Sequence, residues 1–162
     1  MTTAIARPGL LIVDTQWLGE NGCEYRSKIF SPAQPGKFGS EGFWTMAGEA
    51  CAVTLLRHVV SRSTTVQDIA YKLRKEAEGK VDTAFLWVRP SRVHYIDTFG
   101  CATDYTEWIA IGSGAGYARV YLECERWPLD DDEILGRMAM KAAVKLDPHT
   151  GGEIEVRRIG DA

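Results

Sequence analysis

Apolar residues occur in this sequence both as short continuous runs and at helical spacing, and the order of these two patterns along the chain limits the possible folds. Residues 2–6 and 10–14 are short apolar runs typical of β-strands, and the turn sequence Arg-Pro-Gly at residues 7–9 separates them. Across residues 49–60, apolar positions recur instead at the three- and four-residue spacing of an amphipathic helix. We therefore expect a strand hairpin at the start of the chain, followed later by helices.

Further signals extend this order to the end of the chain. The Ser-Thr-Thr sequence at residues 63–65, together with Asp68, predicts the capped start of a second helix, which Gly79 ends. Residues 19–42 are rich in glycine, proline and serine, so only short extended pieces are expected there. The remaining expected elements are extended pieces at 28–30 and 43–46, strands at 83–88, 92–98 and 108–111, helices at 117–125 and 130–146, and a strand at 153–159.

Strand pairs that alternate with helix pairs are typical of two stacked sheets with helices on both outer faces. The sequence therefore predicts an α+β fold, a four-layer αββα sandwich of two antiparallel sheets. The chain has 162 residues, of which 45% are hydrophobic and 25% charged, and this composition suffices for one substantial core. We expect residues 1–162 to form a single domain.

Charge and cysteine placement narrow the possible functions. The net charge of -3 and the pI near 5.6 give no electropositive surface for nucleic acid. No apolar run approaches the roughly 20 residues that a membrane span needs. The four cysteines lie far apart and form no Cys-x-x-Cys pair, so we expect reduced thiols in a cytoplasmic protein, without a metal site or cofactor.

Six short sequence pieces stand in order along nearly the whole chain. They are Thr2-Thr3 after Met1, Val13-Asp14-Thr15-Gln16, Ser27-Lys28-Ile29-Phe30, Ala47-Gly48-Glu49-Ala50, Ile109-Ala110-Ile111-Gly112-Ser113-Gly114, and the turn from Asp147 to Gly152. Together they resemble proteasome β-type subunits and the related bacterial ring-forming peptidases. The resemblance implies an N-terminal-nucleophile (Ntn) hydrolase fold and a threonine-type peptidase that acts inside a homo-oligomeric ring on peptide or protein substrates.

In such a hydrolase, the first residue of the mature chain is both nucleophile and base. Removal of Met1 would leave Thr2 first, and its small side chain suits methionine aminopeptidase. A threonine hydroxyl is a poor nucleophile until a base takes its proton, and a terminal threonine carries an α-amine with a pKa of about 8 close to its hydroxyl. The resemblance therefore implies that Thr2 is the nucleophile.

The resemblance also implies roles for residues around Thr2. Lys28 would lower the pKa of the Thr2 amine by its positive charge, and Asp14 would anchor Lys28. The backbone N–H of Gly48 would stabilise the oxyanion, a contribution of roughly 3 kcal/mol in comparable sites. The family positions that organise the terminal amine match Ser113, Asp147 and Thr150, and those of the specificity pocket match Met46 and Ala50, which would favour apolar substrate side chains.

Two departures from the family pattern keep alternatives open. The first hairpin is shorter than usual, and the span from Lys28 to Gly48 is longer, so Lys37 is the alternative site lysine. A catalytically silent structural or assembly protein and a small-molecule amidase of the same fold are the alternative functions. The sequence identifies no ATPase partner.

Two other functional motifs are excluded at residues 112–116. This glycine-rich segment lacks the spacing of a dinucleotide-binding loop, and Ser113 lacks the flanking glycines of a serine-hydrolase elbow.

Overall fold

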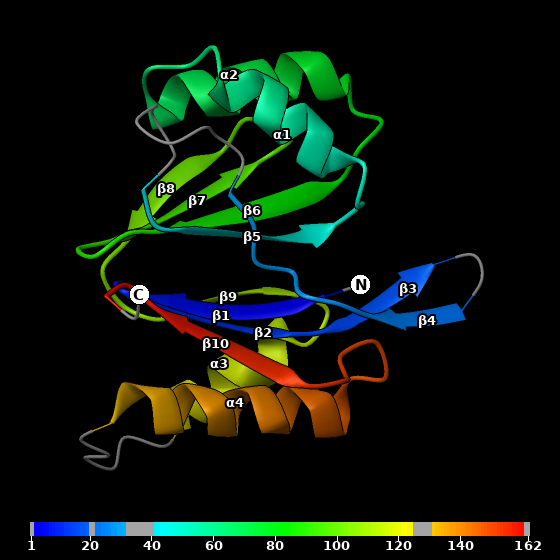
Figure 1. Ribbon diagram of the computed structural model, residues 1–162, viewed down its shortest axis with the longest axis vertical. Coiled ribbons are helices and arrows are strands. Elements are labelled where there is room, and N and C mark those ends of the chain that lie inside the picture. Colours follow the sequence, from blue (N-terminus) through cyan, green and yellow to red (C-terminus); the bar gives the residue numbers. More distant parts are fainter. Residues whose placement is uncertain (1, 20–21, 32–40, 125–130, 161–162) are drawn as a thin grey trace.

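The computed structural model describes residues 2–19, 22–31, 41–124 and 131–160 as four stacked layers (Figure 1). Two helices cover one sheet, a second sheet lies against the first, and two further helices cover the second sheet. This arrangement confirms the expected αββα sandwich. No helix in the described ranges is long and apolar enough to cross a membrane.

The first sheet carries the start of the chain and has the strand order β10-β2-β1-β9, all antiparallel. Its strands are β1 (Thr3–Arg7), β2 (Leu10–Asp14), β9 (Ile109–Gly112) and β10 (Ile154–Arg158). Both faces of β1 and β2 are covered, which is why their apolar runs are continuous. Ala4 and Leu11 pack between the sheets, whereas Ile5 and Ile12 pack against the helices below. The register pairs Thr3 with Gly112.

The second sheet has the antiparallel order β5-β6-β7-β8. It consists of β5 (Phe43–Gly48), β6 (Thr83–Val88), β7 (Val93–Asp97) and β8 (Ala102–Tyr105). The sequence did not predict β8. Its residues Ala-Thr-Asp-Tyr lack an apolar run because the strand lies at the sheet edge and is partly exposed.

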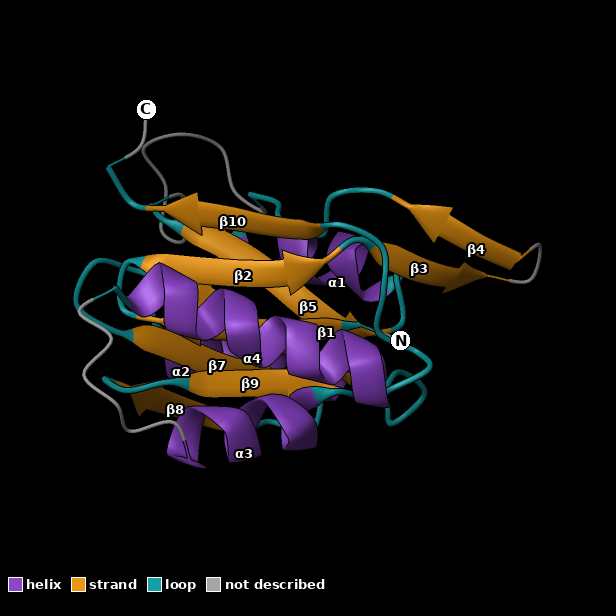
Figure 2. Ribbon diagram, turned by 90° about the horizontal axis from the view of Figure 1, so that it is seen from below, coloured by secondary structure: helices purple, strands orange, loops and turns teal. Residues whose placement is uncertain are grey.

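The helices α1 (Ala52–Val60) and α2 (Val66–Ala77) cover the second sheet, and α3 (Ala115–Cys124) and α4 (Asp132–Leu146) cover the first (Figures 1 and 2). The predicted cap of α2 is present, since the side chain of Thr65 accepts a hydrogen bond from the N–H of Asp68 at 3.0 Å. At the other end, the left-handed Glu78 (φ 50°) is followed by Gly79.

A second hairpin projects from the end of β2 beyond the sandwich (Figure 1). It consists of β3 (Gln16–Gly19) and β4 (Gly22–Tyr25). The sequence does not predict this hairpin, because Gly19 and Gly22 at its turn belong to a stretch whose glycine, proline and serine content is typical of irregular structure. Phe30 then forms an isolated antiparallel bridge with Trp44, in agreement with the extended pieces expected there. The alternative lysine, Lys37, lies outside the described residues.

Candidate active site

A cavity of about 570 Å³ opens where the ends of the two sheets meet. Thr2, Gly112 and Ser113 reach it from the first sheet, at the start of β1 and the end of β9. The second sheet supplies Gly48 at the end of β5 and Ala84 on β6. The lining residues are Thr2, Ala47, Gly48, Glu49, Asp82, Ala84, Gly112 and Ser113. Three of the predicted site residues therefore share one cavity.

Two glycines let the backbone approach closely at this cavity. Gly112 has φ +96°, and a Cβ atom there would lie 1.5 Å from the carbonyl oxygen of Thr2. Gly48 has φ +133°, and a Cβ atom there would lie 2.4 Å from the carbonyl oxygen of Asp82. L-residues with side chains rarely adopt either conformation. These two positions therefore present only backbone groups to the cavity, which is compatible with the oxyanion role predicted for Gly48.

A buried ion pair lies next to the peptide bond between Thr2 and Thr3. The Nζ atom of Lys28 donates a hydrogen bond to Oδ1 of Asp14 at 2.8 Å, and both side chains are 0% exposed. The backbone N–H of Thr3 donates to the same oxygen at 2.9 Å. Lys28 and the Thr2–Thr3 peptide share this acceptor atom. The distance from Nζ of Lys28 to the backbone nitrogen of Thr3 is therefore at most the sum of the two hydrogen-bond lengths. Burial lowers the pKa of Lys28, and the hydrogen bond and charge of Asp14 oppose this shift.

A chain of hydroxyl and carboxylate groups connects Ser113 to the start of β1. Ser113 Oγ donates to Oδ2 of Asp147 at 2.6 Å, and Thr150 Oγ1 donates to the same oxygen at 2.5 Å. Thr150 Oγ1 also lies 2.6 Å from Oγ1 of Thr3, which accepts a hydrogen bond from the N–H of Gly114 at 2.9 Å. Burial raises the pKa of Asp147, but the hydrogen bonds from Ser113, Thr150 and the His149 backbone lower it below the ordinary value overall.

The structure brings most of the predicted site residues together, but it leaves Met46 and Ala50 apart from the cavity. Met46 is 1% exposed and packs with Trp44 and Leu56 in the core beneath α1 and α2. Ala50 is exposed just before α1, and neither residue is among the described lining residues. Strand alternation explains this placement, because Ala47, the neighbour of Met46, faces the other sheet instead. The apolar side chains of the described lining are therefore those of Ala47 and Ala84, not those of Met46 and Ala50.

Thr3 and Gly114 were not predicted as site residues, although both stood in the quoted sequence pieces. Thr3 is fully buried and bonds to Asp14 through its N–H and to Thr150 through its hydroxyl. The sequence offers one signal for Thr3: it is a polar residue at the start of an apolar strand, directly after Thr2. A buried polar side chain needs hydrogen-bond partners, so Thr3 could be expected to bond to polar residues of the site.

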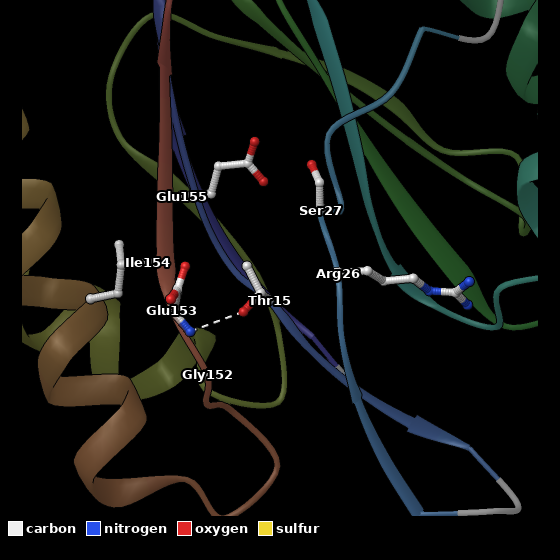
Figure 3. A pocket seen from close by; sticks show the side chains of 7 residues that line it. All are labelled: Thr15, Arg26, Ser27, Gly152, Glu153, Ile154 and Glu155. Carbon is white, nitrogen blue, oxygen red and sulfur yellow. Dashed lines mark hydrogen bonds between the residues drawn. The ribbon is translucent and has the colours of Figure 1, made fainter.

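A larger cavity of about 790 Å³ lies elsewhere, between the start of β10 and residues 26–27 (Figure 3). In Figure 3, Glu155 and Ser27 point toward one another, and Arg26 points away from them. Thr15 Oγ1 accepts a hydrogen bond from the N–H of Glu153 at 2.9 Å. The described lining of this cavity includes none of the predicted site residues. Size therefore does not identify the site here, and we place it at the smaller cavity with Thr2.

Two solved structures share the architecture over nearly their whole length. Eukaryotic HslV from Trypanosoma brucei is 18% identical with a TM-score of 0.72, and the match covers 98% of this chain and 99% of that chain. BPH from Thiobacillus denitrificans, in complex with epoxomicin, is 17% identical with a TM-score of 0.70, and the match covers 98% and 97%. No protein-family model and no curated protein sequence matches the chain. The likeness in structure establishes the fold, and the chain therefore has the Ntn-hydrolase fold of HslV.

Proposed function

We propose that this protein is a threonine-type peptidase whose nucleophile is Thr2 after removal of Met1. The observation that carries the proposal is the buried Lys28–Asp14 pair, which shares an acceptor atom with the Thr2–Thr3 peptide. The desolvation of two charges offsets most of the stability that a buried ion pair gives a fold. A buried pair next to a terminal threonine therefore favours a chemical role. The fold that this chain shares with HslV and with an epoxomicin-bound protein also supports a peptidase function.

In the proposed reaction, the free α-amine of Thr2 takes the proton of its own hydroxyl. The Oγ1 atom attacks the substrate carbonyl carbon, and the N–H of Gly48 stabilises the resulting oxyanion. The C–N bond then breaks, the amine product leaves with the proton, and water hydrolyses the acyl ester to regenerate Thr2. Lys28 keeps the amine unprotonated by its positive charge, while Ser113, Asp147 and Thr150 hold the start of β1 in place.

Covalent labelling tests this proposal directly. Met1-free protein is treated with a peptide vinyl sulfone, to whose double bond Thr2 Oγ1–H would add. We expect a mass increase of one whole reagent, mapped to Thr2. The adduct should be absent in Thr2→Ala and retained in Thr2→Ser. Absence of any adduct at Thr2 in folded, Met1-free protein would instead favour the silent structural alternative, and labelling without peptide cleavage would favour the small-molecule amidase.

We further propose that the protein assembles into a homo-oligomeric ring. Exposed apolar side chains one helical turn apart on α3 and on α4 support this assembly, since large exposed apolar patches mark protein–protein interfaces. They are Tyr117 and Val120 on α3, with Ile134 and Met138 on α4. Native mass spectrometry should find a closed multimer, and a stable monomer at micromolar concentration would contradict the ring.

A further inference from the structure

Two acidic residues, Glu49 and Asp82, belong to the lining of the cavity that contains Thr2, and both are exposed. The other lining residues are small and uncharged, and no lysine, arginine or histidine belongs to the described lining. The thiol of Cys51 donates a hydrogen bond to Oε2 of Glu49 at 3.7 Å, and among the described residues neither Glu49 nor Asp82 forms an ion pair. The cavity therefore presents uncompensated negative charge.

Both carboxylates are held next to the proposed oxyanion donor. Glu49 follows Gly48 directly, and its own N–H donates to Thr83 Oγ1 at 3.0 Å, which fixes the backbone there. Asp82 precedes Thr83, which pairs with Gly48 in the β5–β6 register. The two side chains thus leave from adjacent strand ends, beside the position that a reacting carbonyl would occupy.

We propose that this cavity selects peptide substrates with a cationic side chain, lysine or arginine, beside the reacting carbonyl, and that Glu49 and Asp82 determine this specificity. The inference rests on the proposed function of Thr2. The aliphatic stem of the cation would lie against Ala47 and Ala84, and its charged head would reach the carboxylates. The cavity of about 570 Å³ falls within the usual range of ligand sites.

The size of the preference follows from the exposure of both carboxylates. An exposed ion pair contributes about 0.2–1 kcal/mol, so each carboxylate changes a rate constant by a factor of roughly 1.4 to 5. Together they should favour lysine over leucine by about 2- to 25-fold at low salt. An acidic side chain should react more slowly than leucine because like charges repel. Added salt should reduce both differences.

Three matched peptide vinyl sulfones, with lysine, leucine or glutamate beside the reactive group, test the inference on Met1-free protein. The second-order rate of adduct formation is measured at Thr2 by peptide mapping, which separates it from any reaction at the exposed thiol of Cys51. We expect the rate of adduct formation to be highest for the lysine reagent, intermediate for the leucine reagent and lowest for the glutamate reagent. In Glu49→Gln/Asp82→Asn, the lysine-to-leucine ratio should fall toward one. The control Glu76→Gln removes a carboxylate from the outer helix α2 and should leave that ratio unchanged.

The outcomes separate this inference from the function on which it rests. If Thr2 is labelled at equal rates by the three reagents, or fastest by the leucine reagent, the cationic preference is overturned. The proposal that Thr2 is the nucleophile would still be supported. No labelling with any of the three reagents overturns both. If the double variant does not fold, the salt dependence of the unaltered protein decides: a lysine-to-leucine ratio that stays constant between about 20 mM and 500 mM salt refutes the charge mechanism.

Discussion

Replacement of Lys28 by methionine tests whether the buried ion pair holds the candidate site together. Methionine retains most of the length of the side chain but removes the ammonium group. Asp14 then keeps two hydrogen bonds, from the N–H of Thr3 at 2.9 Å and from the N–H of Gly151 at 3.1 Å. Its carboxylate would remain buried without the cation that the folded chain now places 2.8 Å away.

The expected loss of stability follows from this remaining set of contacts. Removal of one partner from a buried ion pair costs about 3–5 kcal/mol, because the other charge is left in the interior. The two retained N–H donors place Lys28→Met at the lower end, about 3 kcal/mol. A chain of this size loses roughly 2–4 °C in Tm for each kcal/mol, so Tm should fall by roughly 6–12 °C.

Differential scanning calorimetry at one protein concentration measures this change, since assembly makes Tm depend on concentration. Lys80→Met is the matched control. Its partner Glu78 lies 2.7 Å away, but the two side chains are 77% and 65% exposed, so the pair contributes little. The reasoning is refuted if the two variants lose the same Tm. The double variant Asp14→Asn/Lys28→Met should recover part of the loss, because no buried charge is then left unpaired.

Three further predictions concern single positions. Gly112→Ala should cost at least about 2 kcal/mol and abolish labelling of Thr2, because the positive φ and the Thr2 carbonyl exclude a Cβ atom; urea unfolding and mass spectrometry check this. Asp147 has a pKa below its ordinary value of 3.8, so its contribution to folding stability is present above that value and is lost as pH falls through the folded pKa; Asp147→Asn should flatten the acid limb of the stability profile below roughly pH 4. Thr65→Ala removes the cap of α2 and should cost about 1 kcal/mol, measured by thermal circular dichroism, with the exposed neighbour Thr64→Ala as control.

Much of the fold could be predicted because its signals are local. The helix spacing across residues 49–60, the Thr65 cap and the turn at residues 7–9 each act within a few residues, and the structure has the corresponding elements. The strand β8 and the β3–β4 hairpin were missed for the opposite reason. Their place in the fold depends on pairing and exposure rather than on an apolar run.

The site could be predicted only as a set of residues, not as an arrangement. The resemblance named Asp14 and Lys28, and the structure places them in contact. It also named Met46, whose side chain is turned into the core by the alternation of β5. Neither Glu49 nor Asp82 was predicted as a site residue, because their shared cavity depends on how the ends of two strands meet. The register of β5 and β6 joins two strands that α1 and α2 separate in the chain, so no hairpin turn determines it.

The hydrogen bonds of Asp14 connect the stability of the fold to the position of the proposed nucleophile. One of its oxygens accepts from Lys28 and from the N–H of Thr3, and the other accepts from the N–H of Gly151. A single buried carboxylate therefore joins β1, β2, the segment that carries Lys28 and the turn that begins at Asp147. A substitution that loosens any of these segments should displace the start of β1, because Thr3 loses a partner that fixes its backbone. Thr2 precedes Thr3 by one peptide bond, so the hydrogen bond from the Thr3 N–H to this carboxylate helps to fix the position of the proposed nucleophile.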